Sequence, residues 1–253
     1  LTDSIGWKGI FIVLLILGVL LLFSNLHFKE SLSVDNRKRG NLKSLVSSFG
    51  IVLKNRRYVY YVLQMGFAMG VLFANISSSP FIVQQHYGFS AFEFSLFFGI
   101  NALAIGLAAG LSVKFKNPEH AMFLGSVGMT MMSAVEFVIL SNEYHFAVYE
   151  AVLFVLLFSM GLTFTASTTL ERANSGTASA LFGAAGFAFG GIVSPLVGLG
   201  DILSTTGLIF FVCSVCSLCF SVLAMNQTHT NLWGSFKCKM GPVTRFVFLR
   251  REK

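Results

Sequence analysis

The stretch KESLSVDNRKRGNLKSLVSSFGIVLKNRR, residues 29–57, decides how the chain is organised, because it separates one long apolar run from six later ones. It contains eight of the chain's 18 Lys and Arg residues. A segment this polar and basic cannot lie within lipid, and clusters of Lys and Arg beside apolar spans remain on the cytoplasmic side of a membrane. The stretch therefore predicts both a break between two parts of the chain and the orientation of the spans around it.

The overall composition indicates a membrane protein. Of the 253 residues, 55% are hydrophobic and 11% are charged, which leaves too little polar surface to cover a soluble globule. A helix needs roughly 20 apolar residues to cross the hydrocarbon core, and the apolar runs lack the period-two alternation of membrane strands. We therefore predict an all-α membrane protein with seven transmembrane helices, at residues 7–28, 58–79, 92–113, 120–140, 146–168, 177–199 and 205–225.

The positions of Lys and Arg predict which side of the membrane each link faces. Basic residues occupy alternate links, and only Lys8 falls on the opposite side. By the positive-inside rule the C-terminus is cytoplasmic, with a basic cytoplasmic loop at 29–57 and a basic cytoplasmic tail at 227–253. The net charge of +7 is explained by this placement, so no nucleic-acid partner is expected.

Three polar side chains, Gln64, Asn75 and Ser78, recur at helical spacing on one side of the second predicted span. An amide within lipid needs hydrogen-bonding partners, so this side must face protein or a water-filled cavity. Two interpretations remain open, namely hydrogen bonding between helices and the wall of a substrate-binding cavity.

Two further sets of polar residues lie in other spans. Ser159 and Thr163 share a face of the fifth span, although a hydroxyl group can also bond a carbonyl of its own helix. Asn101 is a lone amide in the third span, where it either joins two helices or binds a ligand. The predicted substrate-binding residues are therefore Gln64, Asn75, Ser78, Asn101, Ser159 and Thr163.

Glu136 is the most deeply placed acidic residue, about one helical turn inside the outer end of the fourth span. A carboxyl group that binds and releases a proton can carry charge through an alternating cavity, so proton coupling is one interpretation of Glu136. Snorkelling to the interface, or pairing with another group, is the other. Glu93 and Glu150 lie at outer helix ends, where we expect both to be solvated.

Motifs for catalysis or cofactor binding are missing from the sequence. It contains neither a Gly-x-x-x-x-Gly-Lys-Ser/Thr loop for ATP nor a His-Glu-x-x-His metal helix. Three cysteines, Cys213, Cys216 and Cys219, lie within the last span, where we expect packing residues and no metal site because lipid disfavours thiolates. We predict no enzyme activity and no cofactor.

Small residues predict where helices approach one another. Three Gly-x-x-x-Gly pairs each place two glycines on one helix face, which lets two backbones pack closely: Gly66 and Gly70, Gly106 and Gly110, and Gly186 and Gly190. Pro195 in the sixth span removes a backbone hydrogen bond and is expected to bend that helix.

Three blocks of sequence resemble the Bcr/CflA drug-resistance branch of the major facilitator superfamily. The block SPFIVQQHYGFSAFEFS at 79–95, followed by FGINAL at 98–103, is similar to its seventh-to-eighth helix region. GTASAL at 176–181 with SPLVG at 194–198 resembles its eleventh helix. WKxxF at 7–11 and ESL at 30–32 resemble the beginning and the end of that branch's sixth helix.

This resemblance implies a partial major-facilitator fold that contains helices six to twelve. Residues 1–28 would be the last helix of an incomplete N-terminal half, residues 29–57 the central loop and residues 58–226 the six-helix C-terminal half. The first five helices would be missing from this sequence.

The resemblance also implies a function, which is proton-coupled efflux of amphipathic drugs or small metabolites across a bacterial inner (plasma) membrane, as in multidrug resistance. Helices seven and ten would contribute to the cavity walls. The implied partners are the lipid bilayer, a small amphipathic substrate, protons and the missing N-terminal helices of the same polypeptide.

Seven spans with an outer N-terminus also describe a seven-helix receptor, and a non-transporting membrane assembly protein is a further alternative. The sequence lacks the Asp-Arg-Tyr and Asn-Pro-x-x-Tyr motifs and the outer-loop cysteines typical of such receptors. We therefore favour a secondary transporter.

Overall fold

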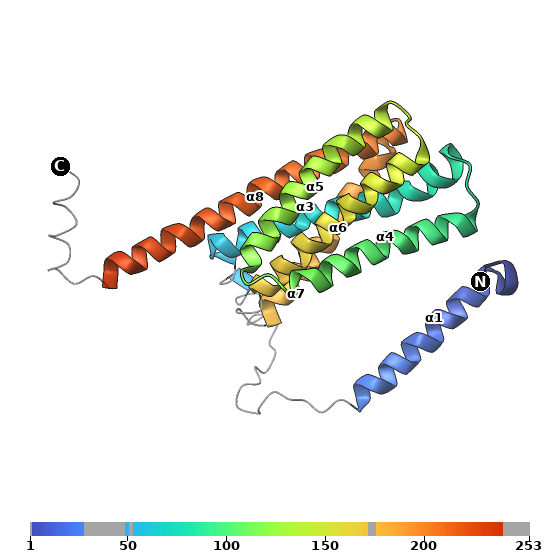
Figure 1. Cartoon of the computed structure of the whole chain (residues 1–253). Coiled ribbons are helices and arrows are strands. Elements are labelled where there is room, and N and C mark those ends of the chain that lie inside the picture. Colours follow the sequence, from blue (N-terminus) through green and yellow to red (C-terminus); the bar gives the residue numbers. More distant parts are fainter. Residues whose placement is uncertain (1, 28–48, 51–52, 172–175, 240–253) are drawn as a thin grey trace. The chain divides into compact units, whose positions relative to one another are not determined.

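The computed structural model describes residues 2–27, 49–50, 53–171 and 176–239, and its long elements in these ranges are helices (Figure 1). Seven of them are long and apolar enough to cross a membrane, which confirms the predicted fold class. In chain order the elements are α1 (Thr2–Leu26), α3 (Arg56–Pro80), the π-helix η2 (Phe81–His86), α4 (Ala91–Ser112), α5 (Pro118–Ser141), α6 (Phe146–Glu171), α7 (Gly176–Leu196), the 3-10 helix η4 (Val197–Leu199) and α8 (Ile202–Lys239).

The chain divides into two compact units, Leu1–Leu42 and Lys43–Lys253. The first unit contains α1, in which Gly6 has a φ of +64° and interrupts the helix. Glycine adopts this left-handed conformation without the steric penalty that a side chain would bring. The apolar span of α1 then runs from Lys8 to Leu26, close to the first predicted span.

The second unit is a bundle of α3 to α8. In it α3 packs against α7 and α8 and also touches α6, while α5 packs against α6 and α8. The remaining helix, α4, packs mainly against α6. Buried apolar side chains such as Val71, Met129 and Leu156 fill the space between the helices. Since α3 contacts three neighbours, its polar side chains are enclosed by protein.

Side-chain caps fix where several helices begin. Asn55 accepts hydrogen bonds from the backbone at the start of α3, and Asn117 does the same for α5. Ser90 and Glu93 form a capping box at the start of α4, so Glu93 is exposed, as predicted, and caps its own helix. Such caps satisfy backbone N–H groups that have no partner in the first helical turn.

The second span continues beyond its predicted end at residue 79. The helix passes through Pro80 and widens into η2, which ends at His86. Proline has no N–H group to donate and its ring crowds the preceding turn, so the ladder of α-helical hydrogen bonds cannot continue unchanged. The wider π-helical turn accommodates this break, and it carries Val83 to the lining of a pocket described below.

The last predicted span, 205–225, is confirmed by the apolar span Ile202–Asn226, and its helix α8 continues beyond residue 225 to Lys239. The first proline after this point in the sequence is Pro242, so proline does not interrupt the helix at the predicted end of the apolar run.

Two of the three predicted glycine pairs pack between α3 and α7. The ring of Phe189 fills the space beside Gly66, and the side chain of Phe73 fills the space beside Gly190. The other glycine of each pair faces the opposite helix as well. A phenylalanine from each helix therefore occupies a notch made by a glycine on the other, which holds α3 and α7 together.

The third predicted pair, Gly106 and Gly110 on α4, behaves differently. A Cβ atom added to either glycine would have no atom of the described residues within 4 Å beyond its own stretch of helix. This pair does not pack within the described bundle. The contact between α5 and α6 instead uses Gly125, where a Cβ atom would lie 2.7 Å from both the Ser159 carbonyl oxygen and the Thr163 amide nitrogen.

We expect Gly125→Ala to destabilise the bundle, because the added methyl group meets backbone atoms and not only a movable side chain. Overpacking typically costs about 1–3 kcal/mol, so the unfolding midpoint of the purified protein in detergent should fall. Gly106→Ala is the matched control, because alanine favours a helix and its Cβ meets no described atom of another element within 4 Å. Equal midpoints for the two variants would contradict the described contact between α5 and α6.

Candidate functional site

Gln64 joins α3 to α8. Its side chain is buried, its Nε2 donates to the Ser217 hydroxyl at 3.2 Å, and the Ser217 hydroxyl donates to the Gln64 carbonyl oxygen at 3.1 Å. These reciprocal contacts agree with the interpretation of Gln64 as a residue that bonds two helices.

Asn75 and Ser78 lie further along α3 and are buried as well. Ser78 donates to the Ala74 carbonyl oxygen at 2.9 Å within its own helix. Asn75 accepts a hydrogen bond from Ser79 on Oδ1 at 2.9 Å, and Ser79 also contacts the Tyr149 hydroxyl on α6. Asn75 is therefore connected through Ser79 to a second helix.

Ser159 and Thr163 lie in the contact between α6 and α5. Thr163 donates to the Met122 carbonyl oxygen across that contact at 3.2 Å, whereas Ser159 donates to the Val155 carbonyl oxygen of its own helix at 2.8 Å. Their face of α6 is covered by Gly125 and its neighbours on α5. The structure thus keeps these two residues apart from the amides of α3 and α4.

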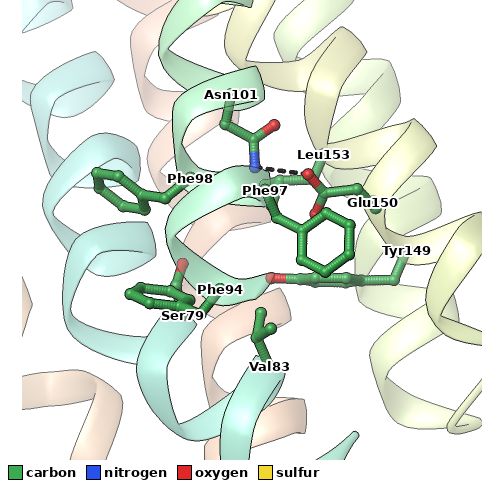
Figure 2. A pocket seen from close by; sticks show the side chains of 9 residues that line it. All are labelled: Ser79, Val83, Phe94, Phe97, Phe98, Asn101, Tyr149, Glu150 and Leu153. Atoms are coloured by element: carbon green, nitrogen blue, oxygen red, sulfur yellow. Dashed lines mark hydrogen bonds between the residues drawn. The ribbon is translucent and has the colours of Figure 1, made fainter. Parts of the chain in front are cut away.

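Asn101 and Glu150 meet in a small pocket between α3, α4 and α6 (Figure 2). The Asn101 Nδ2 donates to the Glu150 Oε1 at 3.0 Å. Glu150 was expected to be solvated, but it lies one turn into α6 on the side that packs against α4, so it is partly buried. The lining residues are Ser79, Val83, Phe94, Phe97, Phe98, Asn101, Tyr149, Glu150 and Leu153.

Two acceptor atoms of this pocket have no hydrogen-bond partner in the described part of the chain. They are the Oδ1 of Asn101 and the Oε2 of Glu150, and both are buried. A buried acceptor without a partner costs about 1–3 kcal/mol, so two adjacent examples call for an explanation. One explanation is a guest that donates hydrogen bonds.

Glu136 on α5 is fully buried, and neither of its carboxylate oxygens has a partner among the described residues. Its carboxyl group interacts electrostatically with Glu150 and with Tyr149. The structure therefore brings the predicted proton-coupling residue near the Asn101 pocket, although Glu136 does not line it.

A polar cluster at the other end of α5 was not recognised in the sequence. Arg57 and Glu119 form an ion pair at 2.5 Å, and the Tyr61 hydroxyl donates to Glu119 at 3.1 Å. The spacing of Arg57 and Tyr61 places them on one face of α3, which the sequence could have indicated. Their partner Glu119 is 62 residues further along than Arg57, and no local pattern identifies it.

The described residues contain no group of three or more His, Cys, Asp or Glu side chains that could hold a metal ion.

We expect Gln64→Ala and Ser217→Ala each to lower the free energy of unfolding, because each leaves the other side chain without this partner. Hydrogen bonds between membrane helices contribute roughly 0.6–2 kcal/mol. The double variant should lose less than the sum of the single variants, measured by denaturant unfolding of the purified protein. Additive losses would show that the two residues are not coupled. A changed drug profile with unchanged stability would instead support Gln64 as a cavity residue.

Comparison with known proteins agrees with this architecture. The family model described as Major Facilitator Superfamily matches residues 1–195. An uncharacterised MFS-type transporter of Bacillus subtilis (strain 168), YdgK, is 34% identical over 235 residues, which cover 89% of this chain and 58% of that protein. The chain thus spans 58% of the length of this curated relative. Proteins of this superfamily are transporters and not enzymes. The family match and the seven apolar helices together show that the chain is a multi-pass membrane protein that belongs to the major facilitator superfamily.

Proposed function

We propose that this chain is part of a secondary active transporter of the Bcr/CflA branch, which exports amphipathic drugs or small metabolites in exchange for protons. Membership of the superfamily supports transport, and the sequence blocks at 79–103 and 176–198 support the branch. The observation that carries the proton-coupling part is Glu136, a fully buried carboxyl group that lacks a hydrogen-bond partner among the described residues.

The surroundings of Glu136 argue against a structural role. Glu136 lies about one turn inside the end of its span, where an acidic side chain usually pairs with another group or snorkels to the interface. Glu136 does neither within the described bundle, because it is enclosed and its electrostatic neighbour is another acid, Glu150. A carboxyl group kept in such a place is typical of a proton relay in a transporter.

Proton binding and release at Glu136 would follow from access to water. The protonated carboxyl group carries no charge and can stay enclosed, whereas the ionised group needs water or a positive partner. A conformation that opens the outer end of α5 to water would let Glu136 take up a proton from outside, and a conformation open to the cytoplasm would release that proton inward. This cycle links enclosure of Glu136 to its protonation, which is the coupling that an antiporter needs.

Among the predicted substrate-binding residues, Asn101 has the strongest support, because it lines a pocket and retains a free acceptor among the described residues. Asn75 is connected to the same pocket through Ser79. The remaining candidates form hydrogen bonds to other helices or within their own helix; they are Gln64, Ser78, Ser159 and Thr163.

We propose the bacterial inner membrane as the location of the protein, with a cytoplasmic C-terminus.

The test uses the full-length protein in cells and the accumulation of a fluorescent amphipathic drug. We expect wild-type protein to lower accumulation, a protonophore to abolish that effect, and Glu136→Gln to remove proton-driven efflux while drug binding to purified protein is retained. The matched control is Glu143→Gln, because Glu143 is an exposed residue in the link between α5 and α6. Normal pH-dependent efflux in the Glu136→Gln variant would exclude Glu136 as the proton carrier.

A further inference from the structure

We propose that the pocket of Asn101 and Glu150 binds the ammonium group of an amphipathic amine, so that organic amines are the preferred substrates. This inference rests on the proposed export function and specifies the substrate class. It is carried by the chemistry of the pocket, in which the unpartnered atoms among the described residues are all acceptors.

The hydrogen bond between Asn101 and Glu150 explains why the pocket prefers a ligand that donates hydrogen bonds over one that accepts them. Asn101 uses its Nδ2 to donate to Glu150, which leaves its Oδ1 as an acceptor, and the second oxygen of Glu150 is an acceptor as well. A guest that satisfies both must donate two hydrogen bonds, and an anion or an ether oxygen would face only lone pairs. An ammonium group donates up to three hydrogen bonds, and its positive charge pairs with the negative charge of the Glu150 carboxylate.

The walls of the pocket favour an organic cation over a metal ion. The rings of Phe94, Phe97, Phe98 and Tyr149 line the pocket together with the two polar residues (Figure 2). Aromatic faces attract cations, and cages of such rings bind ammonium ligands. A hard metal ion would instead require about six oxygen ligands or retained waters, which these apolar rings do not provide.

The size of the pocket limits what enters it. Its volume is about 10 Å³, close to the room that one water-sized group needs. A primary ammonium group meets this limit, whereas the apolar body of the ligand must remain outside. Phe98 lines the pocket and is 37% exposed, so part of its ring is available to that body.

The charges around the pocket support the same preference. The electrostatic partner of Glu150 on helix α5 is Glu136, a second acid, which supplies no positive counter-charge. In the described part of the bundle neither Lys nor Arg interacts with Glu150, whose hydrogen bond comes from neutral Asn101. The bound amine would therefore supply the counter-charge that the described residues do not place there.

The test compares two probes that share one body, dansylcadaverine with its primary amine and N-acetyl-dansylcadaverine without the charge. Each is titrated against the purified full-length protein by dansyl fluorescence. We expect wild-type protein to bind the amine at least about tenfold more tightly, since a charge-assisted hydrogen bond and cation–π contacts are lost on acetylation. Equal affinity for the two probes would overturn the proposal without any variant.

Variants then locate the preference. Glu150→Gln should reduce the affinity for the amine about tenfold and leave the affinity for the acetylated probe unchanged, because it removes the charge that the ammonium group pairs with. Glu150→Asp should retain the preference, and Glu143→Gln serves as the exposed control. An unchanged preference in Glu150→Gln, or an equal loss of both probes, would refute the assignment to this pocket.

Failure of this inference can be distinguished from failure of the export function. Proton-dependent export of both probes at equal rates would refute the preference for amines and leave the export function standing. Selective binding of the amine without proton-dependent export would support the pocket and refute the export function.

Discussion

Inside a membrane bundle a polar side chain has to find its partner in the protein, because lipid offers none. Most buried polar groups here obey this constraint. Gln64 exchanges hydrogen bonds with Ser217 on α8, and Thr163 donates to a carbonyl oxygen of α5. Serine side chains such as Ser78 return to their own helix. These bonds, with the glycine contacts, determine which helix faces can meet, so the few groups that break the rule stand out.

Three of the exceptions, two acids and one amide, interact with one another in one part of the bundle. Glu136, Glu150 and Asn101 each have a buried oxygen without a partner among the described residues, and electrostatic interactions or a hydrogen bond connect them. Each such atom weakens the folded state by an amount comparable to a lost hydrogen bond. These unpartnered oxygens do not stabilise the bundle. We therefore propose that the three residues bind ligands and protons.

The sequence predicted what local pattern controls and missed what depends on distant pairing. The seven spans followed from apolar length, and Gly66 and Gly190 followed from the spacing of small residues. Glu150 was expected in solvent because it lies near a helix end. Its partner Asn101 on α4 lies 49 residues earlier, and no local pattern around Glu150 indicates that contact. The same holds for Arg57 and Glu119. The second span was predicted to end just before Pro80, but a π-helical turn can absorb a proline and the helix continues.

The two ends of α5 differ in a way that bears on transport. Near its start, Glu119 is held by Arg57 and by the hydroxyl group of Tyr61, which ties α5 to the beginning of α3. Near its other end, Glu136 has no such tie among the described residues, and its electrostatic neighbours there are acidic or phenolic groups. Opening the first end would break an ion pair, whereas opening the second would hydrate a lone carboxyl group. Hydration of the second end would therefore satisfy a buried carboxyl group, which is a gain that the first end does not offer.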